Sequence, residues 1–213
     1  MLAPAAIPLA DQLKARTQDL HTRAERHPFQ AALMRGQLGR AGLIALHAQL
    51  FLLHDALERH LAAARTTDPR LAAVVKDYHF RAGHLHADLT FLGVNPAATP
   101  AAEPTRRLIE SLPAIARENP LWLLGALYVL EGSTNGAKYI MRAIQKATDL
   151  PGPQGLTYLD PHGEAQTERW QRFRADVNAL NLQGPEAAAV IAAAEDTFQY
   201  MIDLFETLHP ASP

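Results

Sequence analysis

The chain has 213 residues, a formal net charge of −2 and no cysteine, which excludes disulfides, thiolate nucleophiles and iron–sulfur clusters held by the chain itself. The near-neutral charge argues against nucleic acid or an acidic membrane surface as a partner, and no apolar run is long enough for a membrane-spanning helix. The apolar N-terminal segment lacks a preceding basic region, so we expect a cytoplasmic protein without a signal peptide.

Helical periodicity dominates the chain, because apolar residues recur at spacings of three and four and seldom alternate with polar ones. We expect helices over 9–25, 38–64, 106–117, 120–148, 164–180 and 185–208, and two shorter ones within 71–92. The proline- and glycine-rich segment 150–164 is expected to be irregular. These elements predict an all-α fold with a single domain over residues 1–213 and a helical core over about 9–208.

Three histidines are followed four residues later by a carboxylate, which places both groups on one helix face. The pairs are His21–Glu25, His54–Glu58 and His84–Asp88. One ring nitrogen can then bind a metal while the other donates to the carboxylate, although an exposed helix pair has the same spacing. We favour His21 as a ligand because it lies beside the apolar face of its helix. His54, in a leucine-rich helix, fits equally well as a hydrogen-bonded core residue.

A second group of histidines, His79, His84 and His86, lies close to Asp88. Their spacing does not place three ligands on one helical turn, so we expect them to form a solvated face. A di-iron centre in a helical bundle commonly uses two Glu-x-x-His motifs, one on each of two helices, and the chain does not contain two. Glu58 and His54 together with His84 and Asp88 keep a di-iron site open as an alternative.

Two glycines, Gly132 and Gly136, interrupt an otherwise strong helical pattern between Leu124 and Lys146. Each costs about 1 kcal/mol relative to alanine in a helix interior. Missing Cβ atoms would let a flat ligand or another backbone approach closely and would let the helix bend. Tight helix–helix packing through the same glycines is the alternative explanation, and the sequence leaves both open.

Four segments resemble heme oxygenases, and they occur in the family's order over nearly the whole chain. LKARTQDLHTRAE (13–25) is similar to the family's proximal helix, and LYVLEGSTNGAKYI (127–140) to the glycine-rich distal helix of its bacterial EGS-type members. RFRADVNAL (172–180) and DTFQYMIDLFETL (196–208) resemble the closing helix pair. The resemblance implies an all-α heme oxygenase-like fold in which heme is sandwiched between a proximal and a kinked distal helix.

The resemblance also implies roles for individual residues. His21 would be the proximal iron ligand, with Glu25 as the partner of its ring, and Gly132, Ser133 and Gly136 would form the catalytic distal face. The remaining implied heme contacts come from the propionate-binding positions and the pocket wall: Lys14, Arg174, Ala137, Tyr128, Phe198, Phe205 and the further candidate Lys138. Ser133 stands where many family members carry an aspartate, and a hydroxyl cannot carry charge at neutral pH.

By the same resemblance, heme b would be both cofactor and substrate, cleaved with O2 to biliverdin, carbon monoxide and free iron. The chain has no flavin or nicotinamide motif, so we expect an external electron donor such as a ferredoxin or a reductase. The biliverdin product could serve iron acquisition or supply a bilin-accepting photoreceptor. The alternatives are a non-catalytic heme carrier or sensor, a non-heme di-iron oxygenase on the same scaffold, and a helical interaction module without a cofactor.

Overall fold

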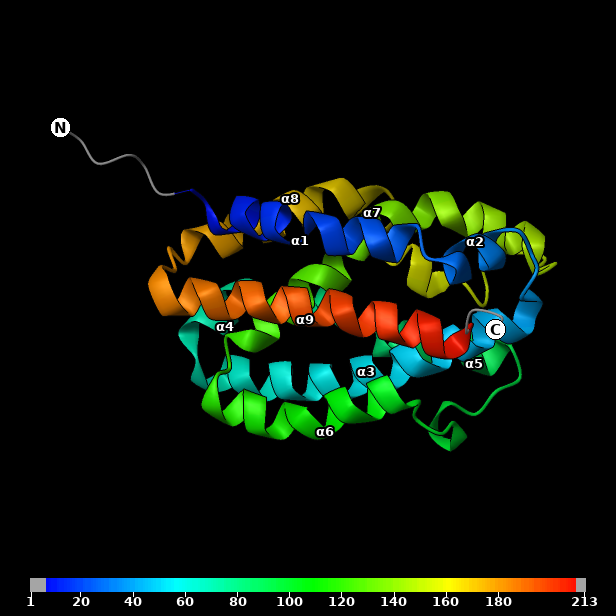
Figure 1. Cartoon of the computed structure of the whole chain (residues 1–213), viewed down its shortest axis with the longest axis horizontal. Coiled ribbons are helices and arrows are strands. Elements are labelled where there is room, and N and C mark those ends of the chain that lie inside the picture. Colours follow the sequence, from blue (N-terminus) through cyan, green and yellow to red (C-terminus); the bar gives the residue numbers. More distant parts are fainter. Residues whose placement is uncertain (1–6, 210–213) are drawn as a thin grey trace.

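The computed structural model in Figure 1 describes residues 7–209, and within this range the side chains of residues 97 and 137–139 lie outside the description. The described part contains nine α-helices and four short 3₁₀ helices and no strand, which confirms the all-α fold. The α-helices are α1 (Leu9–Glu25), α2 (Pro28–Met34), α3 (Gly39–Thr67), α4 (Pro69–Val74), α5 (Ala82–Phe91), α6 (Glu103–Glu118), α7 (Trp122–Ala147), α8 (Gln166–Ala179) and α9 (Gly184–Leu208). The 3₁₀ helices are η1 (Asp77–His79), η2 (Pro96–Ala98), η3 (Thr157–Leu159) and η4 (Gly163–Ala165).

Most predicted helix ends agree with the structure to within three residues, and α1 agrees at both ends. Helix α2 is the element that the periodicity does not predict. Pro28 ends the preceding helix but also occupies the first position of α2, where its missing N–H is not needed. The Nδ1 atom of His27 accepts a hydrogen bond from the backbone N–H of Phe29 at 3.2 Å and so caps the helix.

Helix α7 differs from the prediction in two ways. It begins at Trp122 with Leu121 as its N-cap, so Pro120 lies before the helix rather than in its first turn. Its helical assignment also runs unbroken through the glycine segment, so the distortion expected there does not interrupt the helix. Ser133 and Thr134 each donate a hydrogen bond to the carbonyl three residues earlier, both at 2.7 Å, and these side chains satisfy polar groups within the helix itself.

The helices pack side by side around one hydrophobic core (Figure 1). Helix α9 crosses the middle of the view, with α1 and α8 along one side and α3 and α6 along the other. Gly125 of α7 lies against α9, where an added Cβ would clash with the carbonyl of Val190 and the side chain of Ala193. The close helix–helix packing weighed for the α7 glycines is therefore found at Gly125.

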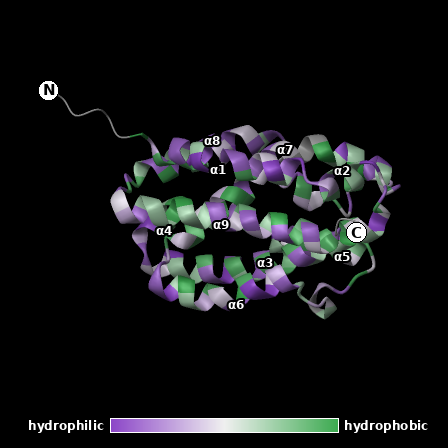
Figure 2. Ribbon diagram, in the orientation of Figure 1, coloured by the Kyte–Doolittle hydropathy of each residue, from purple (hydrophilic) through white to green (hydrophobic). Residues whose placement is uncertain are grey.

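Hydrophobic and hydrophilic residues alternate around individual helices (Figure 2). This is the pattern of amphipathic helices that share a core. Between residues 7 and 209, none of the helices combines the length and the apolarity needed to cross a membrane.

Candidate functional site

A cavity of about 550 Å³ opens between α1, α7, α8 and α9 and reaches inward to α3. Most of its lining is apolar, and its volume falls within the range of small-molecule and cofactor sites. Almost every residue that the resemblance assigns to the heme site lines this cavity: Lys14, His21, Glu25, Tyr128, Gly132, Ser133, Gly136, Arg174, Phe198 and Phe205. The side chains of Ala137 and Lys138 lie outside the described residues.

The α1 wall presents the imidazole of His21. Its Nδ1 atom lies 3.5 Å from Oε2 of Glu25, and 47% of its side chain is exposed. The ring of Phe198 on α9 meets the imidazole edge to face, with ring centroids 5.6 Å apart. The pairing of Nδ1 with a carboxylate leaves the other ring nitrogen available to a ligand in the cavity.

The α7 wall carries the two glycines in different surroundings. A Cβ added to Gly136 would meet nothing within 4 Å, so this stretch of backbone faces open space. A Cβ on Gly132 would lie 3.3 Å from the edge of the Trp170 ring. The open wall at Gly136 favours the close approach of a ligand over helix packing as the reason for that glycine.

Two cations line the same cavity. The guanidinium of Arg174 forms an ion pair with Asp11 of α1 at 2.6 Å, and both side chains are partly exposed. Lys14, one helical turn further along α1, is exposed. Positive side chains at the rim of an apolar cavity suit a ligand that carries carboxylates.

Aromatic side chains complete the wall. Tyr128 is buried beside Trp170, with ring centroids 5.5 Å apart, and burial raises the pKa of its hydroxyl. Phe205 is 2% exposed and stacks on Phe29 at 5.1 Å, so it serves the core as well as the cavity. Both residues present uncharged aromatic surface to the cavity.

The lining residues that the sequence did not predict include Arg81, Tyr158 and Trp170. Trp170 precedes Arg174 by four residues on α8, so helical spacing could have placed it on the same face. Arg81 is the N-cap of α5 and Tyr158 lies in the three-residue η3, so neither belongs to a stretch long enough for helical periodicity to be recognised.

Two candidate metal-binding residues beyond α1, His54 and Asp88, have structural roles. His54 is 1% exposed; its Nδ1 lies 2.8 Å from Glu58 and its Nε2 lies 3.1 Å from the hydroxyl of Tyr158, so it is a hydrogen-bonded core residue. The expected solvated face is wrong for His79 and Asp88, which are both 1% exposed. Asp88 is buried because it accepts hydrogen bonds from the η3 turn, from the backbone and hydroxyl of Thr157 and the backbone of Tyr158.

The residues described by the structure contain no group of three or more His, Asp or Glu side chains arranged to hold a metal ion. The combination of Glu58 and His54 with His84 and Asp88 therefore gives no support to a di-iron centre. Asp88 instead holds η3, and His54 holds Tyr158.

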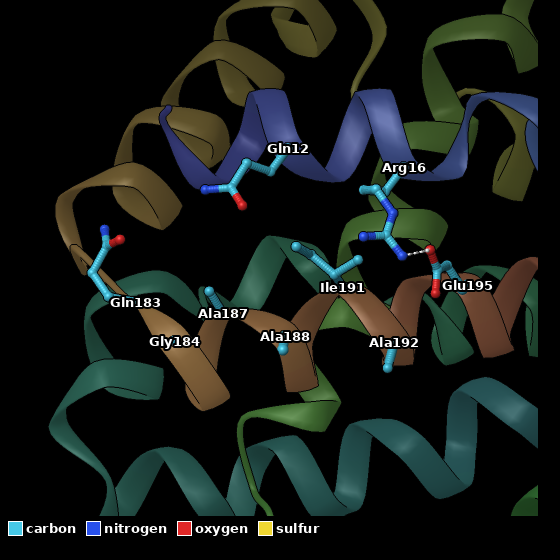
Figure 3. A pocket seen from close by; sticks show the side chains of 9 residues that line it. All are labelled: Gln12, Arg16, Gln183, Gly184, Ala187, Ala188, Ile191, Ala192 and Glu195. Carbon is cyan, nitrogen blue, oxygen red and sulfur yellow. Dashed lines mark ion pairs between the residues drawn. The ribbon is translucent and has the colours of Figure 1, made fainter. Parts of the chain in front are cut away.

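A smaller hollow of about 310 Å³ lies between the N-terminal parts of α1 and α9 (Figure 3). Arg16 and Glu195 form an ion pair across it at 3.2 Å, and small side chains such as Ala187 and Ala188 make up its α9 side. None of the residues predicted to bind heme lies in this hollow.

Comparison with known proteins identifies the family. The sequence profile of heme oxygenase matches residues 7–207. Heme oxygenase 1 of Gallus gallus is 28% identical over 208 residues, covering 94% of this chain and 69% of that protein. The heme oxygenase of Takifugu rubripes is 29% identical over 213 residues, covering 94% of this chain and 74% of that protein.

The fold agrees with these sequence matches. Heme oxygenase-1 from the cyanobacterium Synechocystis, solved in complex with heme, superposes with a TM-score of 0.86 at 21% identity, over 95% of this chain and 93% of that one. A likeness at this identity shows the fold, and the family profile extends over nearly all of the sequence. The chain belongs to the heme oxygenase family.

Proposed function

We propose that this protein is a heme oxygenase that cleaves heme b with O2 to biliverdin, carbon monoxide and free iron. The observation that carries this function is the lining of the main cavity. It combines an imidazole at His21, a helix wall open at Gly136 and two cations at Lys14 and Arg174. A flat apolar macrocycle with an iron centre and two carboxylates is matched by these groups.

When bound, heme supplies the iron at which O2 is activated and the porphyrin ring that is opened. On the α1 side, His21 would hold the iron through the nitrogen that does not face Glu25. Glu25 would fix the tautomer and the orientation of the ring, and the edge of Phe198 would restrict its rotation. A neutral imidazole gives weaker electron donation than a thiolate, which suits oxygenation of the ring.

Lys14 and Arg174 would bind the two propionates and so set the in-plane rotation of the porphyrin. Arg174 must exchange its ion pair with Asp11 for the ligand, which costs little because the pair is partly exposed. Tyr128, Phe198 and Phe205 would hold the apolar edges of the ring. The choice of meso position follows from this orientation.

On the α7 side, Gly132 and Gly136 would let the ring and its O2 lie close to the backbone, with Ala137 beside them. Ser133 would orient water there rather than supply charge, because its hydroxyl cannot ionise at neutral pH. That hydroxyl donates to the carbonyl of Leu130 at 2.7 Å and also interacts with the hydroxyl of Tyr158, so water held there would contact both hydroxyls.

We propose further that the protein works in the cytoplasm and takes its electrons from a separate ferredoxin or reductase. The sequence offers no flavin or nicotinamide motif and no cysteine for an iron–sulfur centre, which supports an external donor. A photoreceptor that accepts the bilin would be a downstream partner.

The test is to mix the purified protein with one equivalent of hemin and then add ferredoxin, its reductase and NADPH under air, with catalase to remove free peroxide. We expect the Soret band to disappear, a bilin absorbance to grow in the red, and carbon monoxide to be trapped by deoxymyoglobin. A Soret band that forms but survives turnover conditions would identify a carrier or sensor instead. A protein that forms no Soret complex would refute heme binding altogether.

A matched pair of variants tests the ligand. His21→Ala is expected to change the ferric heme spectrum and to abolish turnover, and Glu25→Gln to reduce heme affinity or turnover by about 10–100-fold. His86→Ala is the control, because His86 is exposed on α5 and does not line the cavity. If His21→Ala keeps the spectrum and the turnover of the unmodified protein, another residue holds the iron.

A further inference from the structure

A fully buried arginine lies in the cavity wall behind the glycine segment. Arg81 is 0% exposed, and its guanidinium packs over the ring of Tyr158 at 5.2 Å. Its Nη2 atom donates to the backbone carbonyl of Leu130, the same carbonyl that accepts from the hydroxyl of Ser133. The charge of Arg81 is therefore separated from Ser133 by a single shared acceptor.

Part of this guanidinium has no hydrogen-bond partner. Its Nε and Nη1 atoms are buried, and neither finds an acceptor among the residues that the structure describes. Burying charged donors without acceptors is costly. The two nitrogens are themselves enclosed, but they belong to a side chain that lines the cavity, so the charge that they carry acts on whatever occupies it.

A chain of polar side chains, Glu131, His162 and Arg169, leads away from the guanidinium of Arg81. The carboxylate of Glu131, itself 0% exposed, lies 3.8 Å from Nη2 of Arg81. Its other oxygen accepts a hydrogen bond from Nε2 of His162 at 3.0 Å. Arg169 donates to Nδ1 of His162 at 2.7 Å, and because arginine can only donate, the proton of the imidazole must lie on Nε2. Nε2 of His162 therefore points its N–H at Glu131.

The charge state of this group follows from the same contacts. Burial acts to raise the pKa of Glu131, but the hydrogen bond from His162 and the charge of Arg81 outweigh it and hold that pKa below its ordinary value. Burial raises the pKa of Tyr158, so its hydroxyl stays neutral. Glu58 is engaged by the backbone N–H groups of Arg81 and Ala82 rather than by the guanidinium. Within residues 7–209, Glu131 is the one carboxylate that pairs with the guanidinium of Arg81.

We propose that Arg81 is the cationic residue of the α7 wall, whose buried charge stabilises negative charge on a ligand facing α7, while Glu131 and His162 act as its positioning residues. This inference rests on the proposed function. The Ser133 hydroxyl carries no charge at neutral pH, and Arg81 would supply the charge beside the glycine segment in its place. The α7 carbonyl of Leu130 is the link that keeps the charge beside the glycine segment.

Azide and imidazole, added to the ferric heme complex, test this role as anionic and neutral probes. Arg81→Met is expected to raise the azide dissociation constant roughly tenfold, the effect of a unit charge acting over about 10 Å at an effective dielectric of about 20. Imidazole affinity should change less than about twofold by the same reasoning, since imidazole binds without charge. Arg81→Lys retains the charge and should restore most of the azide affinity.

Glu131→Gln separates electrostatics from packing. It keeps an acceptor for His162 but removes the charge that compensates Arg81, so azide should bind more tightly. A purely structural role would weaken azide binding in both variants. Unchanged or weaker azide binding in Glu131→Gln overturns the inference, even if Arg81→Met fails to fold.

Arg65→Met is the matched control, because Arg65 pairs with Asp77 away from the cavity; its azide affinity should equal that of the unmodified protein. If the unmodified protein forms no heme complex, the proposed function fails. If that complex forms and Arg81→Met leaves the azide dissociation constant unchanged, only the proposed role of Arg81 is refuted.

Discussion

Gly136 provides a test in which stability and function should move in opposite directions. A Cβ at this position would meet nothing within 4 Å, so Gly136→Ala introduces no clash in the protein without heme. Replacing glycine by alanine inside a helix stabilises it by about 1 kcal/mol. For a domain of this size, that gain corresponds to a rise in Tm of roughly 2–4 °C.

The same methyl group would occupy space that we assign to heme. Overpacking of a well-filled site costs about 1–3 kcal/mol, so heme affinity should fall roughly 5- to 150-fold by the relation between free energy and affinity. Thermal unfolding without heme and titration with hemin measure the two effects separately.

Two other glycines serve as controls for Gly136→Ala. Gly83→Ala adds a methyl group that also meets nothing within 4 Å, but on α5 away from the cavity. It should stabilise by up to about 1 kcal/mol without changing heme affinity. Gly132→Ala should raise the free energy of unfolding by less than Gly136→Ala does, because its Cβ would lie 3.3 Å from the Trp170 ring. If Gly136→Ala binds heme as tightly as Gly83→Ala does, the porphyrin does not approach this part of α7.

Two further predictions concern charge and pH. Asp11→Asn breaks the ion pair with Arg174 at 2.6 Å and should raise heme affinity by up to about fivefold at low salt, the worth of an exposed pair; weaker heme binding would show that Arg174 does not bind a propionate. Burial lowers the pKa of His47 to about 4, despite the nearby charge of Asp88. Between about pH 6.5 and 4, the unfolded chain therefore binds a proton at His47 and the folded protein does not, so the free energy of unfolding decreases as the pH falls. His47→Leu replaces two ring nitrogens that have no hydrogen-bond partners. In urea titrations, the loss of unfolding free energy between pH 7 and pH 5 should be about 2 kcal/mol smaller for this variant than for the unmodified protein. An equal loss in both proteins would show that the fold does not keep His47 neutral.

The helices were predictable where one amphipathic pattern extends over several turns. Helix α1 repeats apolar residues from Leu9 to Ala24 and was predicted at both ends. Helix α2 has only seven residues and is fixed by the cap at His27 and the proline after it, a signal that two turns of periodicity are too short to reveal. The glycines of α7 suggested a distortion, but local side-chain hydrogen bonds from Ser133 and Thr134 accompany an unbroken helix.

The candidate site was predictable where a motif lies within one helix. The segments of α1, α7, α8 and α9 brought their residues to a single cavity because each helix presents one face to it. The arginine behind α7 was not predictable, since its contact with Leu130 joins residues 49 positions apart. The same holds for Tyr158 and His54, which lie 104 positions apart. The sequence also misplaced Asp88 on a solvated face, because the η3 turn that it holds becomes visible only once the chain is folded.

The structure of the protein with heme bound tests the assignment of His21 and α7 in one measurement. We predict that the iron is bound by the His21 nitrogen that faces away from Glu25, and that the opposite face of the porphyrin lies against the backbone at Gly136. An iron held by any other side chain, or a macrocycle bound outside the cavity between α1 and α7, would contradict the site proposed for this protein.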